Sequence, residues 1–229
     1  MVHARKVGDK ELSFIVSGRL WRNSLVMQDK ETGTYWSHVS GEAMEGPLKG
    51  TKLTMIPAVH TTWGKWHTRH PEATLLAKSR KIRSSQYARY FEDPERTGLF
   101  RSRRLIKRMP AKALVHGLTI GLHALAVPDD SLEEGSFAQA HLGEEPVIIA
   151  RGLDGGVRAF RARRAGKAMK FEKSNEKGTA RDTQTGSSWD LERGAAVTGE
   201  LAGERLEEIP VTLAFWFAWS SFYPNTEVL

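Results

Sequence analysis

The sequence predicts an α+β fold built from two pseudo-equivalent repeats, each an antiparallel sheet covered by one tryptophan-bearing helix. The first observation is an internal duplication, because residues 29–76 align without a gap with residues 182–229 and 16 of the 48 pairs are identical. A repeat of this kind decides how the rest of a chain is interpreted. The second observation is that the identical pairs include three tryptophan pairs: Trp36 with Trp189, Trp63 with Trp216, and Trp66 with Trp219.

The first repeat begins with residues typical of strands. Residues 12–16 and 24–27 mix β-branched and large apolar side chains, which favours strands. A hairpin turn follows at residues 29–33, where Gly33 is free to adopt a positive φ. We expect Asp29, like Asp182 at the matching turn, to accept hydrogen bonds from nearby backbone amides, which is a structural role.

The helix of each repeat is expected after a proline. In the first repeat Thr61 or Thr62 can cap a helix that must end before Pro71, because the residue preceding a proline avoids the helical region. In the second repeat Thr212 is the expected cap. The apolar run at residues 211–223 is too short to span a bilayer and predicts a buried helix.

The two repeats differ in length. Before its hairpin the second repeat has a strand pair at residues 113–127, a helical or loop segment at 131–142, and strands at 146–150 and 157–160. The first repeat has almost no counterpart to these, so we expect it to lack its opening strands. The predicted organisation is repeat 1 at residues 1–77, a basic connector at 78–110, and repeat 2 at 111–229.

Composition excludes some chemistry. The chain contains no cysteine, so disulfides, thiolate metal ligands and cysteine nucleophiles are excluded. The net charge is +7. Residues 78–108 hold 11 Lys and Arg against three Asp and Glu, a local charge of +8, which favours either a solvated connector or a surface for an anionic partner.

Several motifs together resemble one family. The segments are LSFIVSGRLW at residues 12–21, VHTTWG at 59–64, FWFAW at 215–219 and PNTEV at 224–228. Over nearly the whole chain they are similar to the prokaryotic domain of unknown function 3179 (DUF3179). The resemblance implies no established activity. Members often look exported, which hints at a periplasmic or extracellular location, although residues 1–10 of this chain are polar and carry no leader. Many members also have a Cys-Pro-x-Cys-like stretch, which this cysteine-free chain lacks.

Histidines around the first helix are the sharpest candidate site. In a helix that starts at His60, the residues His60, Trp63, His67 and His70 share one stripe about 80° wide. Neutral imidazoles are common ligands of divalent transition metals, and His38 is a candidate fourth ligand. The alternative is that these histidines are structural or merely exposed, since the metal-binding helix motif spaces its histidines four apart.

Two further groups are candidate binding residues. Trp21 and Trp63 are candidates for ligand binding, because aromatic rings line many small-molecule pockets, although pairing of six of the seven tryptophans favours a core role. Arginines interleaved with aromatic residues in the connector are candidates for an anionic partner, whereas nucleic acid is disfavoured because no nucleic-acid-binding module accompanies them. These arginines are Arg80, Arg83, Arg89, Arg101, Arg103 and Arg104.

Three function classes remain open from the sequence. We expect a non-catalytic ligand-binding or structural module with a site between the repeats, whose partner is a small ligand or a protein. The alternatives are a metal-dependent protein that uses His60, His67 and His70, and a basic adaptor that binds an anionic partner through residues 78–108. The sequence shows no transmembrane span and names no reaction.

Overall fold

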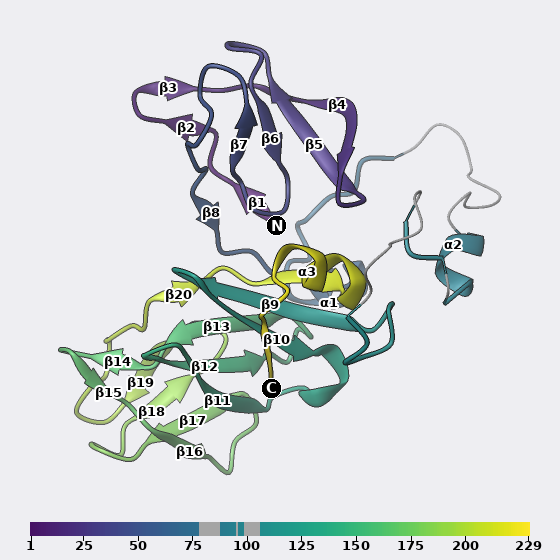
Figure 1. Ribbon diagram of the computed structural model, residues 1–229. Coiled ribbons are helices and arrows are strands. Elements are labelled where there is room, and N and C mark those ends of the chain that lie inside the picture. The colour runs from purple at the N-terminus through teal and green to yellow at the C-terminus, as the bar shows by residue number, and fades with distance from the viewer. Residues whose placement is uncertain (78–87, 95, 99–105) are drawn as a thin grey trace.

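Short strands dominate the molecule. The computed structural model describes residues 1–77, 88–94, 96–98 and 106–229. Strands make up 42% of the chain and helices only 10%, distributed over many small sheets (Figure 1). The prediction of an α+β fold with two repeats of one sheet and one helix is therefore wrong.

The N-terminal lobe, residues 1–58, contains three antiparallel sheets. Its small sheets pair β1 (Val2–His3) with β8 (Met55–Ile56) and β2 (Lys6–Val7) with β3 (Lys10–Glu11). The four-stranded sheet has the order β4 (Phe14–Trp21), β5 (Ser24–Asp29), β6 (Tyr35–Ser37) and β7 (Ala43–Glu45). The core of this lobe is small and contains Leu12, Trp36, Ala43 and Leu53.

The C-terminal lobe, residues 106–229, contains three four-stranded sheets and one hairpin. One sheet has the order β21 (Thr212–Phe215), β9 (Leu114–Ile120), β10 (His123–Pro128) and β22 (Glu227–Val228). The second has the order β11 (Phe137–Leu142), β12 (Glu145–Arg151), β13 (Val157–Arg161) and β20 (Glu208–Ile209). The third has the order β16 (Phe171–Lys173), β17 (Thr179–Asp182), β18 (Ser188–Asp190) and β19 (Ala195–Thr198), and β14 (Arg163–Arg164) pairs with β15 (Lys167–Ala168).

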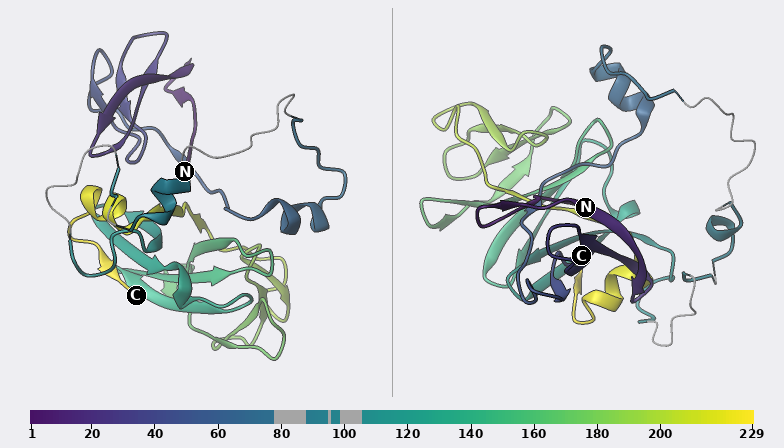
Figure 2. Two further views of the ribbon diagram at one scale, coloured as in Figure 1. Left: turned by 90° about the vertical axis from the view of Figure 1, so that its right-hand side faces the viewer. Right: turned by 90° about the horizontal axis from the view of Figure 1, so that it is seen from above.

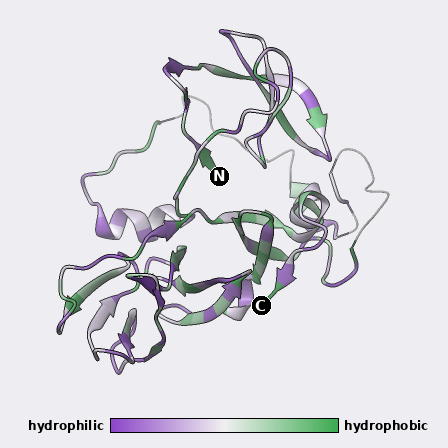
Figure 3. Cartoon of the chain, turned by 60° about the vertical axis from the view of Figure 1, so that its left-hand side comes forward, coloured by the Kyte–Doolittle hydropathy of each residue, from purple (hydrophilic) through white to green (hydrophobic). Residues whose placement is uncertain are grey.

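Burial of apolar side chains concentrates in the C-terminal lobe. Central strands such as β12 carry consecutive fully buried residues, including Val147, Ile148 and Ile149. Hydrophobic stretches of the chain are drawn in green in Figure 3. Burying each such side chain contributes about 1.5–3 kcal/mol. The C-terminal lobe is therefore the larger source of stability.

The helices explain why the sheet-plus-helix prediction fails. Within the described residues they are α1 (Trp63–Arg69), α2 (Ala88–Glu92), α3 (Trp216–Phe222) and a 3₁₀ turn, η1 (Asp129–Ser131). Helix α1 has no buried residue, whereas α3 buries four. Trp63 and Trp66 are each 38% exposed, but their counterparts Trp216 and Trp219 are only 1% and 2% exposed. The same tryptophan spacing thus gives a buried helix only where a sheet lies beneath it.

Individual elements match the sequence to different degrees. The expected strand pair at residues 113–127 is confirmed by β9 and β10. The cap at Thr62 is also confirmed, because its side chain accepts a hydrogen bond from the Lys65 amide. The helical or loop segment expected at residues 131–142 is wrong in its second half, because residues 137–142 form strand β11. The expected buried helix at residues 211–223 is only partly present. Residues 212–215 form strand β21, which pairs with β9, and helix α3 covers residues 216–222.

The duplicated hairpins share one local structure. The Asp29 carboxylate accepts hydrogen bonds from the Thr32 amide at 2.6 Å and the Trp36 indole nitrogen at 2.8 Å. The Asp182 carboxylate accepts the same pair from Thr185 at 2.6 Å and Trp189 at 3.0 Å. The structural role expected of both aspartates is confirmed.

The two lobes lie one above the other and meet beside α3 (Figures 1 and 2). Trp21, at the end of β4, packs edge-on against Phe222 with ring centroids 5.0 Å apart. The guanidinium of Arg22 donates to the carbonyl of Ser221. In the described part of the chain, no helix is long and apolar enough to cross a membrane.

Candidate functional site

A pocket between the lobes

A pocket of about 220 Å³ lies where the two lobes meet. Four of its lining residues come from the N-terminal lobe, between β6 and β8, and three from the C-terminal lobe. They are Ser40, Lys52, Leu53 and Met55 on one side, and Thr119, Pro210 and Tyr223 on the other. A concave site at a boundary between structural units is a usual place for a small ligand.

The wall from the N-terminal lobe is held by a glycine turn. Gly41 has a φ of +72°, and its carbonyl accepts a hydrogen bond from the Leu53 amide at 2.9 Å. A side chain at Gly41 would come within 3.0 Å of the His3 ring. Leu53 is anchored in the core of this lobe, so the adjacent Lys52 is exposed.

The wall from the C-terminal lobe is held by α3. Tyr223 ends this helix, and its amide donates to the carbonyl of Trp219. The two rings also contact each other with centroids 4.3 Å apart. Trp219 in turn donates through its indole nitrogen to the Thr226 hydroxyl at 3.0 Å. The position of Tyr223 therefore depends on the packing of Trp219.

Charges of both signs lie around this pocket, because Glu42 is directly opposite Lys52 in an antiparallel β-bridge. Lys52 is the one charged residue in the lining. Burial lowers the pKa of the nearby His3; a hydrogen bond to the His38 carbonyl opposes this, and the N-terminal amine and Lys52 lower the pKa further. The Nδ1 atom of His3 is buried without a hydrogen-bond partner. Burial also raises the pKa of the Tyr223 phenol, so its hydroxyl stays protonated at neutral pH.

Other polar sites

A larger pocket, of about 340 Å³, lies wholly within the C-terminal lobe. Its lining is mainly apolar and includes Val147, Met169 and Phe171. It lies where the edge strands β11 and β16 meet, and the Gln139 amide bridges the gap by bonding both the amide and the carbonyl of Phe171 at 2.8 Å. Although this pocket is larger, only one lobe lines it. We therefore take the pocket between the lobes as the candidate site.

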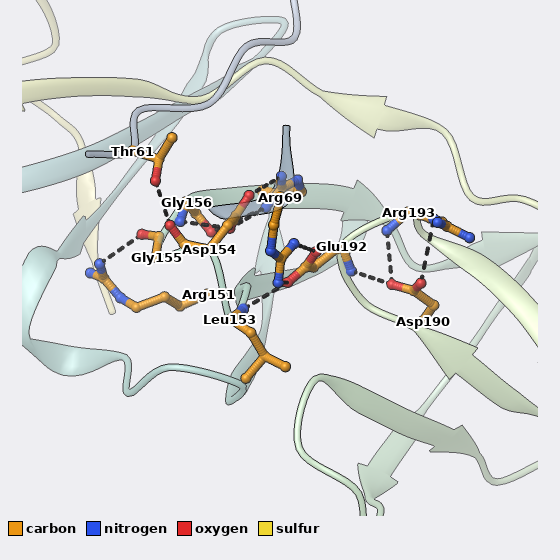
Figure 4. Close-up of polar contacts among 11 residues, drawn as sticks. Thr61, Arg69, Arg151, Leu153, Asp154, Gly155, Gly156, Asp190, Glu192 and Arg193 are labelled. Atoms are coloured by element: carbon orange, nitrogen blue, oxygen red, sulfur yellow. Dashed lines mark hydrogen bonds and ion pairs between the residues drawn. The ribbon is translucent and has the colours of Figure 1, made fainter. Parts of the chain in front are cut away.

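Helix α1 is attached to the C-terminal lobe by polar contacts (Figure 4). The Arg69 guanidinium forms a two-pronged ion pair with Glu192, with one contact of 2.9 Å, and Glu192 also accepts the Leu153 amide at 2.7 Å. The Thr61 hydroxyl donates to the Asp154 carbonyl at 2.5 Å. Such contacts at an exposed surface contribute little free energy each. They position α1 without burying it.

A buried histidine forms a separate network. His116, on β9, contacts the Asp129 carboxylate at 2.7 Å, and Arg151 contacts the same oxygen at 2.6 Å. Burial lowers the pKa of His116, and the hydrogen bond and charge of Asp129 only partly oppose this. Arg151 also donates to the carbonyls of Leu132 and Gly155. This network joins strands β9 and β12 to the β10–β11 connection and to the β12–β13 turn, which is a structural role.

Where the predicted residues lie

The predicted metal ligands do not converge. His60 precedes α1, so the helical stripe on which the prediction rested is not formed. His67 stacks on Trp63 and His70 on Trp66, with centroids 5.0 Å and 4.0 Å apart. Among the described residues there is no group of three or more His, Cys, Asp or Glu side chains that could hold a metal ion.

His38 lies in the N-terminal lobe, where its carbonyl oxygen accepts a hydrogen bond from the Nε2 atom of His3 at 2.8 Å. The two candidate ligand-binding tryptophans are not in the lining of the pocket between the lobes. Trp21 contacts Phe222 at the lobe boundary, and Trp63 is on the exposed helix α1. The side chains of the six connector arginines lie outside the described residues.

Sequence reasoning missed the residues that line the pocket. The duplication aligns Tyr223 with His70. This alignment predicts only that an aromatic-sized residue stands before a proline, not that Tyr223 lines a pocket. Lys52 aligns with Arg205 and looks like an ordinary exposed base. Only the placement of one lobe on the other brings these residues together with Thr119.

Comparison with known proteins

No curated protein matches the chain. One family model, described as a protein of unknown function (DUF3179), matches residues 1–226 of the 229. The resemblance expected from the motifs is therefore confirmed, and the chain belongs to the DUF3179 family.

Proposed function

We propose that this protein is a non-catalytic ligand-binding module whose site is the pocket between its two lobes. The observation that carries the proposal is the lining, which both lobes supply. A ligand in this pocket contacts residues from both lobes at once, so its binding stabilises their relative placement. Ligand binding to the folded state alone also raises the stability of the whole protein.

The chemistry of the lining supports binding rather than catalysis. Ser40, Thr119 and Tyr223 contribute hydroxyl groups, and Lys52 contributes an ammonium group. The remaining three lining residues are apolar. The seven lining residues include no histidine or carboxylate, the groups that most often transfer protons in enzymes.

A library of small polar molecules, screened by thermal unfolding, tests this proposal. Ser40→Phe and Thr119→Phe fill the pocket from opposite lobes, and Thr183→Phe, in the lining of the larger pocket, is the matched control. We expect molecules that raise the unfolding temperature of the wild type to lose this effect in both pocket-filling variants and to keep it in the control. The proposal is wrong if the rise in unfolding temperature is lost only in Thr183→Phe. It is also wrong if every molecule has the same effect on the pocket-filling variants as on the wild type.

A further inference from the structure

The two lobes share more of their framework than the duplicated hairpins. Three backbone hydrogen bonds recur at matching places beside the four-stranded sheets β4–β7 and β16–β19. Strands β1 and β8 therefore correspond to β13 and β20, and β4 corresponds to β16. The three bonds run from the amides of Ala4, Leu12 and Lys30 to the carbonyls of Thr54, Arg5 and Ser13 in one lobe, and from the amides of Arg161, Met169 and Thr183 to the carbonyls of Glu207, Ala162 and Lys170 in the other.

A hairpin fills the gap between β13 and β16 in the C-terminal lobe. It consists of β11 and β12, and β12 pairs with β13 (Figure 1). On the β13 side, the amide of Ala162 donates to the carbonyl of Pro146 at 2.8 Å. On the β16 side, the Gln139 side chain bonds the amide and the carbonyl of Phe171, each at 2.8 Å. The hairpin thus satisfies backbone groups on both sides of the gap.

The matching gap in the N-terminal lobe, between β1 and β4, has no such hairpin among the described residues. The backbone amide of Arg5, which matches Ala162, has no hydrogen-bond partner in that part of the chain. The carbonyl of Ser13 accepts the Lys30 amide, so Ser13 faces β5. Backbone groups of successive residues in an antiparallel pair face alternate sides, so the amide and the carbonyl of Phe14 face away from β5. Both sides of the gap therefore present backbone groups that a further strand can bond.

Apolar side chains on these two strands are also uncovered. Val2 on β1 is 46% exposed, and Val16 on β4 is 72% exposed. Beyond Val16 the register of β4 shifts, so the regular part of this edge is short. An edge strand that carries apolar side chains and unpaired backbone groups is a template for pairing with another chain.

The interior of the N-terminal lobe lacks the cover that β12 gives to the C-terminal lobe. Phe14 packs edge-on against Trp36, as their counterparts do, with centroids 5.8 Å apart in both lobes. In the C-terminal lobe β12 adds Ile148 and Ala150 to the same core cluster, and Phe171 is buried. Phe14 has no such cover among the described residues and is only partly buried. A strand in the gap can therefore bury apolar side chains against it.

From these observations we propose that the gap between β1 and β4 is a docking site for an extended segment of another polypeptide. The segment pairs with β1, bonds the backbone of Phe14, and places apolar side chains against Phe14 and Trp36. Peptides that add to a sheet edge gain affinity from main-chain hydrogen bonds and specificity from alternate side chains. Because His3 stands where the C-terminal lobe has Phe160, the residue opposite it can be polar. None of these residues lines the pocket between the lobes, so this proposal is independent of the proposed function.

A synthetic peptide of residues 137–151, the β11–β12 hairpin, is the probe, and it is added to the full chain. Amide hydrogen exchange is followed by NMR. We expect saturating peptide to slow exchange at the amides of Arg5 and Phe14 by about tenfold, because each gains a hydrogen bond. The amides of Ala162 and Phe171 are the matched internal controls. Both are already bonded, so their exchange should not change.

Two altered peptides make the test specific. A peptide with Ile148→Pro lacks the amide that would bond β1, so it should leave exchange at Arg5 and Phe14 unchanged. A peptide with Ile148→Thr keeps a residue that favours strands and places a hydroxyl opposite His3. It should protect the same two amides as the unaltered hairpin.

The proposal is wrong if neither the unaltered hairpin nor its Ile148→Thr form protects the amides of Arg5 and Phe14, or if the Ile148→Pro peptide protects them equally. It is also wrong if these amides become protected as the protein concentration rises without peptide, because a second copy of the chain then covers the gap. None of these results bears on the pocket between the lobes, which the Ser40→Phe and Thr119→Phe variants test separately.

Discussion

Single buried polar residues account for much of the local structure. Asp182 is fully buried, and its carboxylate accepts hydrogen bonds from the amides of Thr185, Gln184 and Ser187 as well as from the Trp189 indole. Burial alone would raise the pKa of this carboxyl, but these bonds outweigh it, so the pKa lies below the usual 3.8. A single side chain thus satisfies most of the donors of its hairpin.

Asp182→Ala should destabilise the protein by about 3–5 kcal/mol at pH 7, because several buried donors lose their acceptor at about 1–3 kcal/mol each. Since the folded-state pKa is depressed, this stabilisation is present above about pH 4 and is lost as the pH falls through the folded-state value. Urea unfolding of wild type and variant between pH 7 and pH 3 measures it. Asp9→Ala, at an exposed turn, is the control, and equal losses in the two variants would contradict the account.

The sequence predicts the roles of single hairpin residues well, but it does not predict which residues line the pocket. The turn role of Asp29 and Asp182 follows from residue type and from the duplication, because the interactions are local. The pocket depends on Lys52 and Thr119, which are 67 positions apart in the chain. No periodicity or motif relates such positions, so only the packing of the lobes shows that they share a site.

At the scale of elements, the same helical sequence pattern has two outcomes. Helices α1 and α3 share two tryptophans and a following proline, yet only α3 lies on a sheet. Strand β9 makes this possible at Gly117, where a Cβ atom would be 2.3 Å from the Trp219 ring. The residues of α1 have no such surface beneath them, which is why the core role that the repeat pairing favoured for Trp63 and Trp66 is wrong.

Gly117→Ala should destabilise the protein by about 2–3 kcal/mol, because the rigid indole of Trp219 must move to admit the new methyl group. Gly64→Ala is the matched control, since a Cβ there meets no atom within 4 Å and lies within helix α1, where alanine is favoured over glycine by about 0.5–1 kcal/mol. Thermal unfolding of both variants measures the contrast. A tolerated Gly117→Ala would show that Trp219 is not packed on β9 as described.

At the scale of the whole molecule, the fold class could not be predicted from the duplication. The duplicated hairpins lie in four-stranded sheets of the same order, but the C-terminal lobe adds two further four-stranded sheets, which contain β9–β10 and β11–β12. Residues 212–215 become strand β21 because the edge of β9 is available to them, whereas the aligned residues 59–62 have no strand to pair with among the described residues. Tertiary partners, which the local sequence does not encode, decide these outcomes.

The central claim is that the pocket between the lobes binds a ligand. The chain has six methionines, of which Met55 lines this pocket and Met169 lines the larger one. The most direct measurement is an NMR titration of protein labelled with ¹³C at the methionine methyl groups, with a molecule that raises the unfolding temperature of the wild type. The account predicts a saturable shift of the Met55 signal while the Met169 signal stays in place. A shift of the Met169 signal without a shift of the Met55 signal would contradict it, as would the absence of any Met55 shift with every molecule that stabilises the protein.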